Sequence, residues 1–323
     1  MNKIIAVSVG DVNGIGIHIL LNAWKSNEIE NFIIFTDPKK IRKYLKEKKI
    51  EDKVNIVNNE KLKLNYKKNK LNIYSFKSRS LEENTYKSLE YSYELCKKKL
   101  CIGMVTLPIR KDLIIKNINN NFIGHTEYFQ KLDKKKYSNM ILFHKKIIVT
   151  PITTHVELKK VSKIISNKKY LYDKILSLYY VLINDFNIKK PKLIISGLNP
   201  HAGENGVLGK EEIKSIIPVI NKLKSKRIYI DGPFSGDGML LKNNLKKYNC
   251  FIFMFHDQAL ITFKYISQFS GVNYTGNLSI IRTSPDHGTA YNLIGSNKIS
   301  NLSLLNCFKL VRKIYNNRIN AKT

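Results

Sequence analysis

The feature that most limits the fold is a repeated order of elements along the chain. An apolar run that predicts a buried strand is followed by a polar, often glycine-containing loop and then by a helical pattern, beginning at residues 4–9, 102–107, 146–149, 193–195 and 251–255. Short apolar runs separated by helical segments are typical of sheets covered by helices, so the sequence predicts a layered α/β fold. Ligands of open α/β sheets bind beyond the carboxyl ends of the strands, and we therefore look for function in the loops after these runs.

The loop after residues 193–195 is the richest in polar residues that can do chemistry. It contains five glycine or proline residues before the helical pattern resumes at Glu211, which places His201 and Glu204 on a strand-to-helix connection. A histidine in such a loop is either a functional group or an ordinary surface residue, and this segment alone does not distinguish them.

Three histidines recur at equivalent positions, each just after an apolar strand. They are His155, His201 and His256, separated by 46 and 55 residues. Three imidazoles from three parallel strand ends can converge on one divalent cation and leave coordination positions open for a substrate. No local spacing such as His-x-x-x-His supports this, and three separately hydrogen-bonded histidines also fit the pattern.

Candidate anion-binding residues lie elsewhere in the chain. His125 and Thr126 stand at the start of a predicted helix, where backbone N–H groups and the helix dipole favour a phosphate or carboxylate; alternatively, Thr126 only caps the helix. Lys264 and Arg282 can form charge-assisted hydrogen bonds to the same groups, or be solvated at the surface.

The length and composition indicate a two-domain, enzyme-sized protein. With 323 residues and 43% hydrophobic residues, the chain can build two cores. No apolar run has the length of a membrane span, and residues 4–9 are too short for the apolar region of a signal peptide, so we expect a cytoplasmic protein. The scattered Cys96, Cys101, Cys250 and Cys307 predict buried free thiols.

The net charge of +31 raises the question of nucleic-acid binding. Only seven of the 56 basic residues are arginine, the side chain that phosphate and base readers favour, and the lysines are spread over the whole chain. We therefore interpret the charge as solvated surface and expect no specific nucleic acid. A basic RNA-binding protein on a decayed enzyme scaffold is the alternative of another class.

Five motifs together resemble one enzyme family. The motifs occupy residues 124–127 (Gly-His-Thr-Glu), 154–156 (Thr-His-Val), 197–204 (Gly-Leu-Asn-Pro-His-Ala-Gly-Glu), 256–258 (His-Asp-Gln) and 282–290 (Arg-Thr-Ser-Pro-Asp-His-Gly-Thr-Ala). In this order they resemble the 4-hydroxythreonine-4-phosphate dehydrogenases of vitamin B6 (pyridoxal 5'-phosphate) synthesis, and the match extends from Gly10 to the last helix. The resemblance implies an isocitrate/isopropylmalate dehydrogenase-like fold of two α/β/α domains with the active site in the cleft between them.

The activity implied by the resemblance is an NAD-dependent oxidation of the secondary alcohol of 4-phosphooxy-L-threonine. Loss of carbon dioxide then gives 3-amino-2-oxopropyl phosphate. A sister dehydrogenase acting on phosphothreonate or phosphoerythronate is the nearest alternative, because these substrates differ by a hydroxyl in place of the amino group.

The resemblance also implies the site residues, carried over position by position. One divalent ion, zinc or magnesium, is expected on His155, His201 and His256, with one histidine supplied by the neighbouring subunit of a homodimer. Catalytic roles are implied for Lys264 and His201. The expected substrate-binding residues are His125, Thr126, Lys264, Asn273 and Arg282, and the expected cofactor-binding residues are Asp286, His287, Gly288, Thr289 and Ala290.

The domain boundaries follow from the same resemblance. Residues 1–127 and 272–323 are expected to form the cofactor-side domain, and residues 128–271 the central domain with the metal and dimer sides. Three places near the expected site depart from the usual family sequence: Ser235-Gly236 stands in place of Pro-Ala, Ala259 in place of glycine, and Asn277-Leu278-Ser279 in place of Gly-Leu-Pro.

Overall fold

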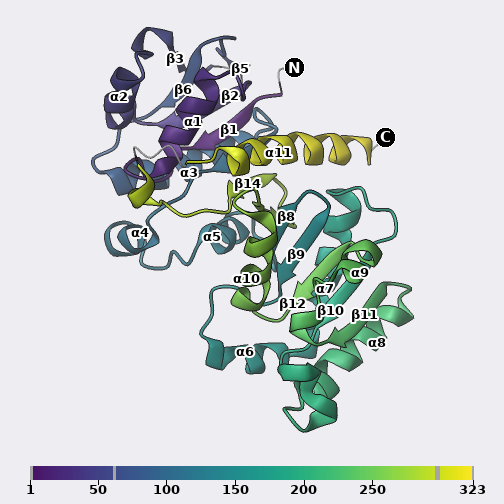
Figure 1. Cartoon of the computed structure of the whole chain (residues 1–323). Helices are drawn as coiled ribbons and strands as arrows, with labels where there is room; N and C mark the ends of the chain where they lie inside the picture. Colours follow the sequence, from purple (N-terminus) through teal and green to yellow (C-terminus); the bar gives the residue numbers. More distant parts are fainter. Residues whose placement is uncertain (1–2, 61–62, 295–298, 322–323) are drawn as a thin grey trace. The chain divides into compact units, whose positions relative to one another are not determined.

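The computed structural model describes residues 3–60, 63–294 and 299–321 and divides the chain into two compact units (Figure 1). The first unit consists of Met1–Gly124 and Ser279–Asn316, and the second of His125–Leu278 and Asn317–Thr323. Each unit is an α/β structure with six strands of the large sheet. The predicted α/β fold class is therefore confirmed.

The first unit is built on a wholly parallel sheet. Its strand order is β14-β7-β1-β2-β6-β3, and every neighbouring pair is parallel. The strands are β1 (Ile5–Ser8), β2 (Phe32–Thr36), β3 (Val54–Val57), β6 (Leu71–Ser75), β7 (Gly103–Thr106) and β14 (Arg282–Pro285). A separate small hairpin pairs β4 (Asn59–Glu60) with β5 (Lys63–Leu64).

Helices with well-formed N-termini connect these strands. Helix α3 (Leu81–Lys97) begins after Ser80, whose side chain accepts a hydrogen bond from the N–H of Glu83, and it packs against β1, β2 and β7. Helix α2 (Pro38–Glu47) begins after Asp37, whose side chain accepts a hydrogen bond from the N–H of Lys39. The helices of this unit are α1 (Ile15–Lys25), α2 (Pro38–Glu47), α3 (Leu81–Lys97), α4 (Lys111–Asn117) and α11 (Leu302–Asn320), with the 3-10 turns η1 (Glu51–Lys53) and η5 (Tyr291–Leu293).

The second unit has a mixed sheet in the order β11-β10-β12-β9-β8-β13. The first four strands are parallel, and β8 pairs antiparallel with both β9 and β13. The strands are β8 (Asn139–His144), β9 (Ile147–Pro151), β10 (Lys192–Ser196), β11 (Tyr229–Phe234), β12 (Cys250–Phe253) and β13 (Val272–Gly276).

Helices cover this sheet and complete its core. Helix α10 (His256–Ser267) packs against β9 and β12. Helix α8 (Ile217–Ser225) packs against β11, and helix α7 (Lys168–Asn184) packs against β8 and α8. The buried Val149, Ile194, Phe251, Phe253 and Phe263 form part of one apolar cluster between these elements. The helices are α5 (His125–Leu132), α6 (Leu158–Ile165), α7 (Lys168–Asn184), α8 (Ile217–Ser225), α9 (Lys242–Lys247) and α10 (His256–Ser267), with shorter turns η2 (Pro200–Gly206), η3 (Glu212–Ile216) and η4 (Gly236–Gly238).

The boundaries between the units, after Gly124 and after Leu278, differ by a few residues from the domain boundaries predicted after residues 127 and 271. Strand β13 belongs to the second unit because it pairs along its whole length with β8. The end of α11 also belongs to the second unit, since Arg318 donates from Nε to Asp185 at 2.6 Å and from Nη2 to the Tyr274 hydroxyl at 3.1 Å. Asp185 and Tyr274 are buried, so these contacts fix the last turns of the helix.

The four cysteines are free and buried, as predicted. On α3, Tyr86 and Tyr93 are half-buried, and small polar residues such as Ser88 and Ser92 lie on the buried face. In the described part of the chain, no helix is both long and apolar enough to span a membrane.

Candidate active site

The loop after β9 holds His155 against a carboxylate from α5. The Nδ1 atom of His155 lies 3.0 Å from Oε1 of Glu127, and the hydroxyl of Thr154 donates to the same oxygen at 2.8 Å. Glu127 is the third residue of α5, directly after His125 and Thr126. One carboxylate oxygen thus joins two segments of the second unit.

Electrostatics keep this carboxylate ionised. Burial by itself raises the pKa of Glu127, but the hydrogen bond and charge of His155 and the hydrogen bond of Thr154 outweigh burial and lower the pKa to about 2. The side chain retains 24% exposure, which is less than that of the other acidic groups near these histidines. Glu127 is therefore a negatively charged hydrogen-bond acceptor throughout the neutral range.

His256 lies close to His155 and has a similar carboxylate contact. It is the first residue of α10, and its Nδ1 atom is 2.6 Å from Oδ1 of Asp257. The ring centroids of His155 and His256 are 5.8 Å apart. In both side chains Nδ1 faces a carboxylate, so a neutral ring with its proton on Nδ1 presents the lone pair of Nε2.

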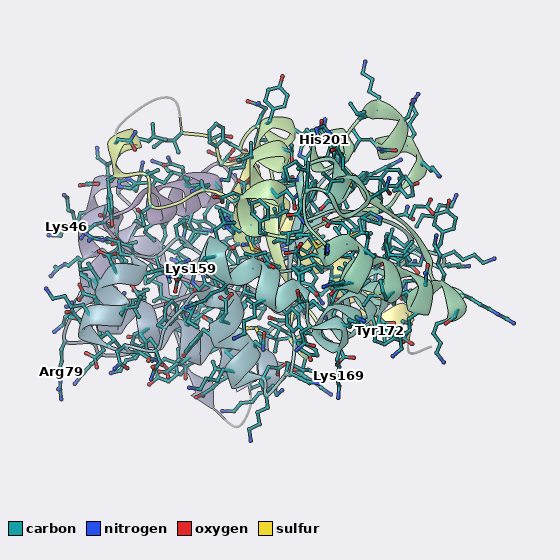
Figure 2. All side chains as sticks on the ribbon, turned by 90° about the horizontal axis from the view of Figure 1, so that it is seen from below. Lys46, Arg79, Lys159, Lys169, Tyr172 and His201 are labelled. Carbon is teal, nitrogen blue, oxygen red and sulfur yellow. The ribbon has the colours of Figure 1, made fainter. Side chains whose placement is uncertain are left out.

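His201 follows β10 and is exposed on an unusual turn (Figure 2). All five residues from His201 to Asn205 have left-handed backbone conformations, with φ values of 49°, 53°, 82°, 42° and 53°. Each non-glycine residue in this region costs roughly 1–2 kcal/mol, so contacts elsewhere must stabilise the turn. We call residues 201–205 the left-handed turn.

The buried carboxylate of Glu212 supplies such contacts. Its Oε1 accepts from the N–H groups of Leu198 at 2.8 Å and Asn199 at 2.9 Å, and its Oε2 accepts from Nδ2 of Asn199 at 2.9 Å. A Cβ atom on Gly203 would lie 2.7 Å from Oε2, and Gly203 has a φ of +82°. The chain therefore wraps closely around Glu212, and glycine is required at the closest point.

These residues fit part of the predicted metal site. Imidazole nitrogens suit zinc and similar ions, and histidine ligands commonly present one ring nitrogen to the metal and the other to a carboxylate. Within the residues that the structure describes, no three His, Cys, Asp or Glu side chains form a group that could hold a metal ion. The expected site includes a histidine from a neighbouring subunit, so His155, His201 and His256 stay a prediction for the assembled protein.

The expected substrate-binding residues are distributed over both units. In the second unit, His125 and Thr126 form the first turn of α5, Thr126 is buried, and Lys264 is exposed on α10. Asn273 lies on β13; its Oδ1 is buried and has no hydrogen-bond partner among the described residues. In the first unit, Arg282 is only 1% exposed, and its Nε donates to the hydroxyl of Thr106 at 3.0 Å.

The expected cofactor-binding residues form a loop after β14 that is anchored at both ends. The N–H of Asp286 donates to the Ser303 hydroxyl on α11 at 3.1 Å, and the carbonyl of Thr289 accepts from the N–H of Ile15 at 2.9 Å. His287 places Nδ1 2.9 Å from the Gly288 carbonyl, and Ala290 has a φ of 42°. A side chain on Gly288 would meet nothing within 4 Å, so this part of the loop is open.

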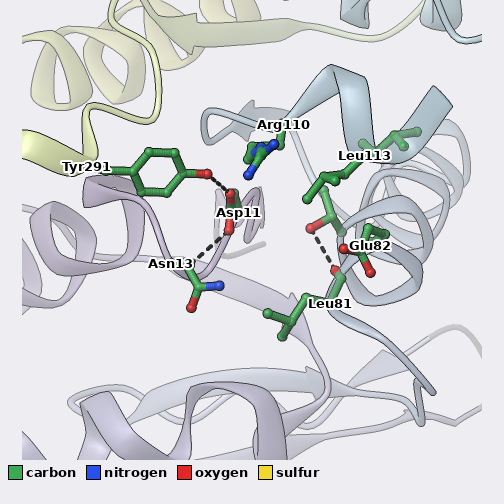
Figure 3. Close-up of a pocket in the computed structure, with 9 residues that line it drawn as sticks. Asp11, Asn13, Leu81, Glu82, Arg110, Leu113 and Tyr291 are labelled. Atoms are coloured by element: carbon green, nitrogen blue, oxygen red, sulfur yellow. Dashed lines mark hydrogen bonds between the residues drawn. The ribbon is translucent and has the colours of Figure 1, made fainter. Parts of the chain in front are cut away.

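A pocket of about 110 Å³ lies beside this loop in the first unit (Figure 3). The hydroxyl of Tyr291, just after the loop, donates to Asp11, and Asp11 also accepts from the N–H of Asn13 at 2.9 Å. The guanidinium of Arg110 pairs with Asp112 and contributes to the pocket lining. The lining residues are Asp11, Asn13, Leu81, Glu82, Thr85, Arg110, Leu113, Ile114 and Tyr291.

Polar side chains on the loops that follow parallel strands place the protein in the class of α/β proteins, which bind ligands at the carboxyl ends of their strands. A model of the family described as pyridoxal phosphate biosynthetic protein PdxA matches residues 28–311, and the chain belongs to this family. This confirms the resemblance found in the sequence motifs.

Named relatives agree with the family. The chain is 31% identical to a 4-hydroxythreonine-4-phosphate dehydrogenase of Bacteroides thetaiotaomicron, with 99% of this chain and 91% of the relative covered. It is 34% identical to the enzyme of the same name from Wigglesworthia glossinidia brevipalpis, with 94% and 95% covered. The crystal structure of the 4-hydroxythreonine-4-phosphate dehydrogenase from Klebsiella pneumoniae matches with a TM-score of 0.79, 25% identity and 98% of each chain covered. The relatives are dehydrogenases, which makes the chain a member of an oxidoreductase family.

Sequence reasoning missed three residues that organise these regions. Glu127 stood within a quoted motif, but nothing in the sequence indicated that it contacts His155. No sequence pattern indicated the contacts of Glu212 or Asp11 either. One sequence signal could have drawn attention to Glu212. An acidic residue follows a loop rich in glycines, and glycines allow the backbone of a loop to pack closely against a neighbouring side chain.

Proposed function

We propose that this chain is an NAD-dependent and divalent-metal-dependent 4-hydroxythreonine-4-phosphate dehydrogenase of pyridoxal 5'-phosphate synthesis. It oxidises the secondary alcohol of 4-phosphooxy-L-threonine, and the product loses carbon dioxide to give 3-amino-2-oxopropyl phosphate. The observation that carries this proposal is the pair of histidines at two strand ends, 5.8 Å apart, each with Nδ1 on a carboxylate, in a chain of this family.

The chain's own residues supply substrate binding. The first turn of α5, with His125 and Thr126, offers backbone N–H groups and the positive end of the helix dipole to the phosphate. The cations of Lys264 and Arg282 complement the negative charges of the substrate, and Asn273 offers an amide whose oxygen is buried and not hydrogen-bonded within the described residues.

His155, His201 and His256 would hold the divalent ion, zinc or magnesium. When bound, such an ion polarises the alcohol oxygen and stabilises negative charge that develops during decarboxylation. The contribution of the protein is to fix the imidazole rings before the ion arrives. Glu127 and Asp257 do this for two rings, and the left-handed turn does it for His201 through the backbone.

The nicotinamide cofactor, which accepts the hydride, is proposed to bind along Asp286–Ala290. Two features support this position. The loop is fixed against Ser303 and Ile15, and it borders the polar pocket containing Asp11 and Tyr291 (Figure 3). A fixed loop with an open glycine position lets a ligand approach the backbone closely.

The protein is proposed to act as a homodimer through the second unit. Ile261 and Tyr265 are 71% and 80% exposed, and their spacing of four residues places them on one side of α10. Phe269, which is 66% exposed, follows the left-handed residue Gln268 just beyond the end of this helix. Large apolar side chains gathered in this way favour a protein interface. Lys264 lies among them, so a neighbouring subunit packed here would lie close to a proposed substrate-binding residue.

The basic surface does not require a nucleic-acid partner. Lys46, Arg79 and Lys169 project away from the ribbon into solvent in Figure 2, and they lie on different helices or loops. Dispersed lysines of this kind support only non-specific contact with phosphates.

The deciding experiment is to measure NADH formation from NAD and 4-phosphooxy-L-threonine, with and without a chelator and with phosphothreonate in parallel. We expect turnover of the amino acid that the chelator stops. Turnover of phosphothreonate alone would identify the protein as a sister dehydrogenase that acts on this substrate. Turnover that continues in the presence of the chelator would overturn the metal requirement. Absence of turnover on both substrates, together with salt-dependent RNA affinity, would favour a decayed enzyme scaffold.

A further inference from the structure

We propose that Glu127 is a positioning residue of the metal site: its carboxylate orients His155 for metal binding and links this histidine to the proposed substrate-binding turn of α5. This inference rests on the proposed function. It assigns a role to a side chain that is neither a proposed ligand nor a proposed substrate contact.

The first argument is the geometry of the carboxylate. Oε1 of Glu127 accepts from two consecutive residues of the loop after β9, from Thr154 at 2.8 Å and His155 at 3.0 Å. Two donors on one oxygen restrict both the loop and the imidazole ring. Because Glu127 lies on α5, a regular helix, the restriction comes from a rigid element and not from the loop itself.

The second argument is the chemistry of imidazole. A carboxylate facing Nδ1 favours the form of His155 that carries its proton on Nδ1, and in that form the lone pair lies on Nε2. The carboxylate also makes the imidazole more basic, so that its Nε2 lone pair binds a metal cation more strongly. His256 and Asp257 repeat this arrangement, with 2.6 Å between Nδ1 and Oδ1.

The third argument is the difference in exposure between the two carboxylates. The Asp257 side chain is 73% exposed and adjacent in sequence to its histidine, whereas that of Glu127 is 24% exposed and 28 residues from His155. Solvent competes less for the less exposed contact. Glu127 therefore holds its histidine more firmly than Asp257 does.

The fourth argument is the position of Glu127 on α5. His125 and Thr126 precede it directly, so a displacement of Glu127 would move the first turn of the helix as well as His155. We therefore expect a change at Glu127 to weaken metal binding and to raise the KM for the phosphorylated substrate together.

The test uses E127Q in the full chain, with E157Q as the matched control. Glutamine keeps the size of the side chain but removes its charge. Glu157 lies two residues after His155, is exposed, and pairs with Lys159 at 2.9 Å and with Lys160, so E157Q makes the same charge change without touching the ring contact.

The primary readout is the zinc affinity of the metal-free protein, measured by competition with a chromophoric chelator; the absorption spectrum of the cobalt-loaded protein reports the ligand geometry. We expect E127Q to weaken zinc binding by about 10–100-fold, as loss of a carboxylate behind a histidine ligand typically does. E157Q should stay within about twofold of the unmodified protein, in keeping with small effects of exposed pairs.

The outcomes separate this inference from the proposed function. Zinc binding by E127Q equal to that of the unmodified protein overturns the role of Glu127 and leaves the metal site standing. If the unmodified protein itself binds no divalent metal ion, the metal site is overturned and the positioning role with it. Should E127Q not fold, T154V removes one donor to the same oxygen, and zinc affinity unchanged in T154V would also overturn the inference.

Discussion

His155 and His201 both follow parallel strands of the second unit, yet carboxylates hold them in different ways. Glu127 contacts the ring of His155 directly, whereas Glu212 contacts the backbone and the Asn199 amide before His201. A carboxylate on the ring sets the proton position and the orientation of one side chain. A buried carboxylate on backbone N–H groups stabilises the path of a whole loop, and the loop then carries the histidine outward.

The two carboxylates are therefore expected to affect different properties, metal binding for Glu127 and folding stability for Glu212. Changes at the ring contact should alter metal binding more than folding, because few backbone groups depend on it. Changes at Glu212 should alter folding first, because buried backbone donors lose their acceptor.

The largest effect is expected from His201→Ala. The side chain is exposed, so its loss should change the free energy of unfolding by less than about 1 kcal/mol, while removal of a proposed metal ligand should lower turnover by roughly a thousandfold or more. NADH formation and thermal unfolding measure the two quantities. Lys214→Ala, at an exposed position of η3 outside the left-handed turn, is the control and should retain activity; full activity of His201→Ala would remove this residue from the site.

The next effect concerns Glu212. Glu212→Ala leaves the N–H groups of Leu198 and Asn199 without their acceptor inside the protein, and we expect a loss of about 2–4 kcal/mol in the free energy of unfolding. Urea denaturation measures this loss. The neighbouring Glu211 is half-buried, and its Oε2 also accepts from Asn199 Nδ2. We expect Glu211→Ala to lower the free energy of unfolding by about 1 kcal/mol or less. Equal losses in both variants would contradict the special position of Glu212.

A pH-dependent effect is expected near the ring contact. Burial lowers the pKa of the Lys174 ammonium to about 8, and the charge of Glu127 partly opposes this shift. Since the folded pKa lies below the unfolded value of about 10.4, the charged form penalises folding below pH 8, and stability recovers as the pH rises from about 8 to about 10.4.

The variant Lys174→Met isolates this titration. Relative to the variant, the native protein should gain up to about 3 kcal/mol of stability across that pH window, because the folded pKa of about 8 lies well below the unfolded pKa of about 10.4 and each pH unit between them contributes about 1.36 kcal/mol. Urea denaturation at pH 7 and pH 10 tests it. A stability difference that is the same at both pH values would show that the Lys174 ammonium does not titrate differently in the folded state.

The smallest effect compares two glycines. Gly203→Ala places a Cβ 2.7 Å from Glu212 at a φ of +82°, and we expect it to cost about 1–2 kcal/mol of stability. Gly288→Ala, where a Cβ meets nothing within 4 Å, should cost less than about 0.5 kcal/mol. Thermal unfolding distinguishes them, and equal midpoints would mean that the left-handed turn relaxes around the added methyl group.

Much of the fold was predictable because its signals are local. Apolar runs such as residues 193–195 and 251–255 became the central strands β10 and β12, and helix starts such as His125 were placed correctly. Strands β8 and β13 were not predicted, since their antiparallel pairing depends on partners far away in the chain. The predicted boundary between residues 271 and 272 consequently assigned all of β13 to the cofactor-side domain, whereas the structure groups this strand with the second unit.

The sequence by itself determined the α/β alternation, the family, and the occurrence of histidines just after strands, because strand and helix periods and motifs are properties of neighbouring residues. Only the tertiary structure decided that Glu127 contacts His155 and that Glu212 lies under the backbone leading to His201. Such contacts join segments whose separation along the chain carries no information about their distance in space, and packing of the helices on the sheet brings them within hydrogen-bonding range.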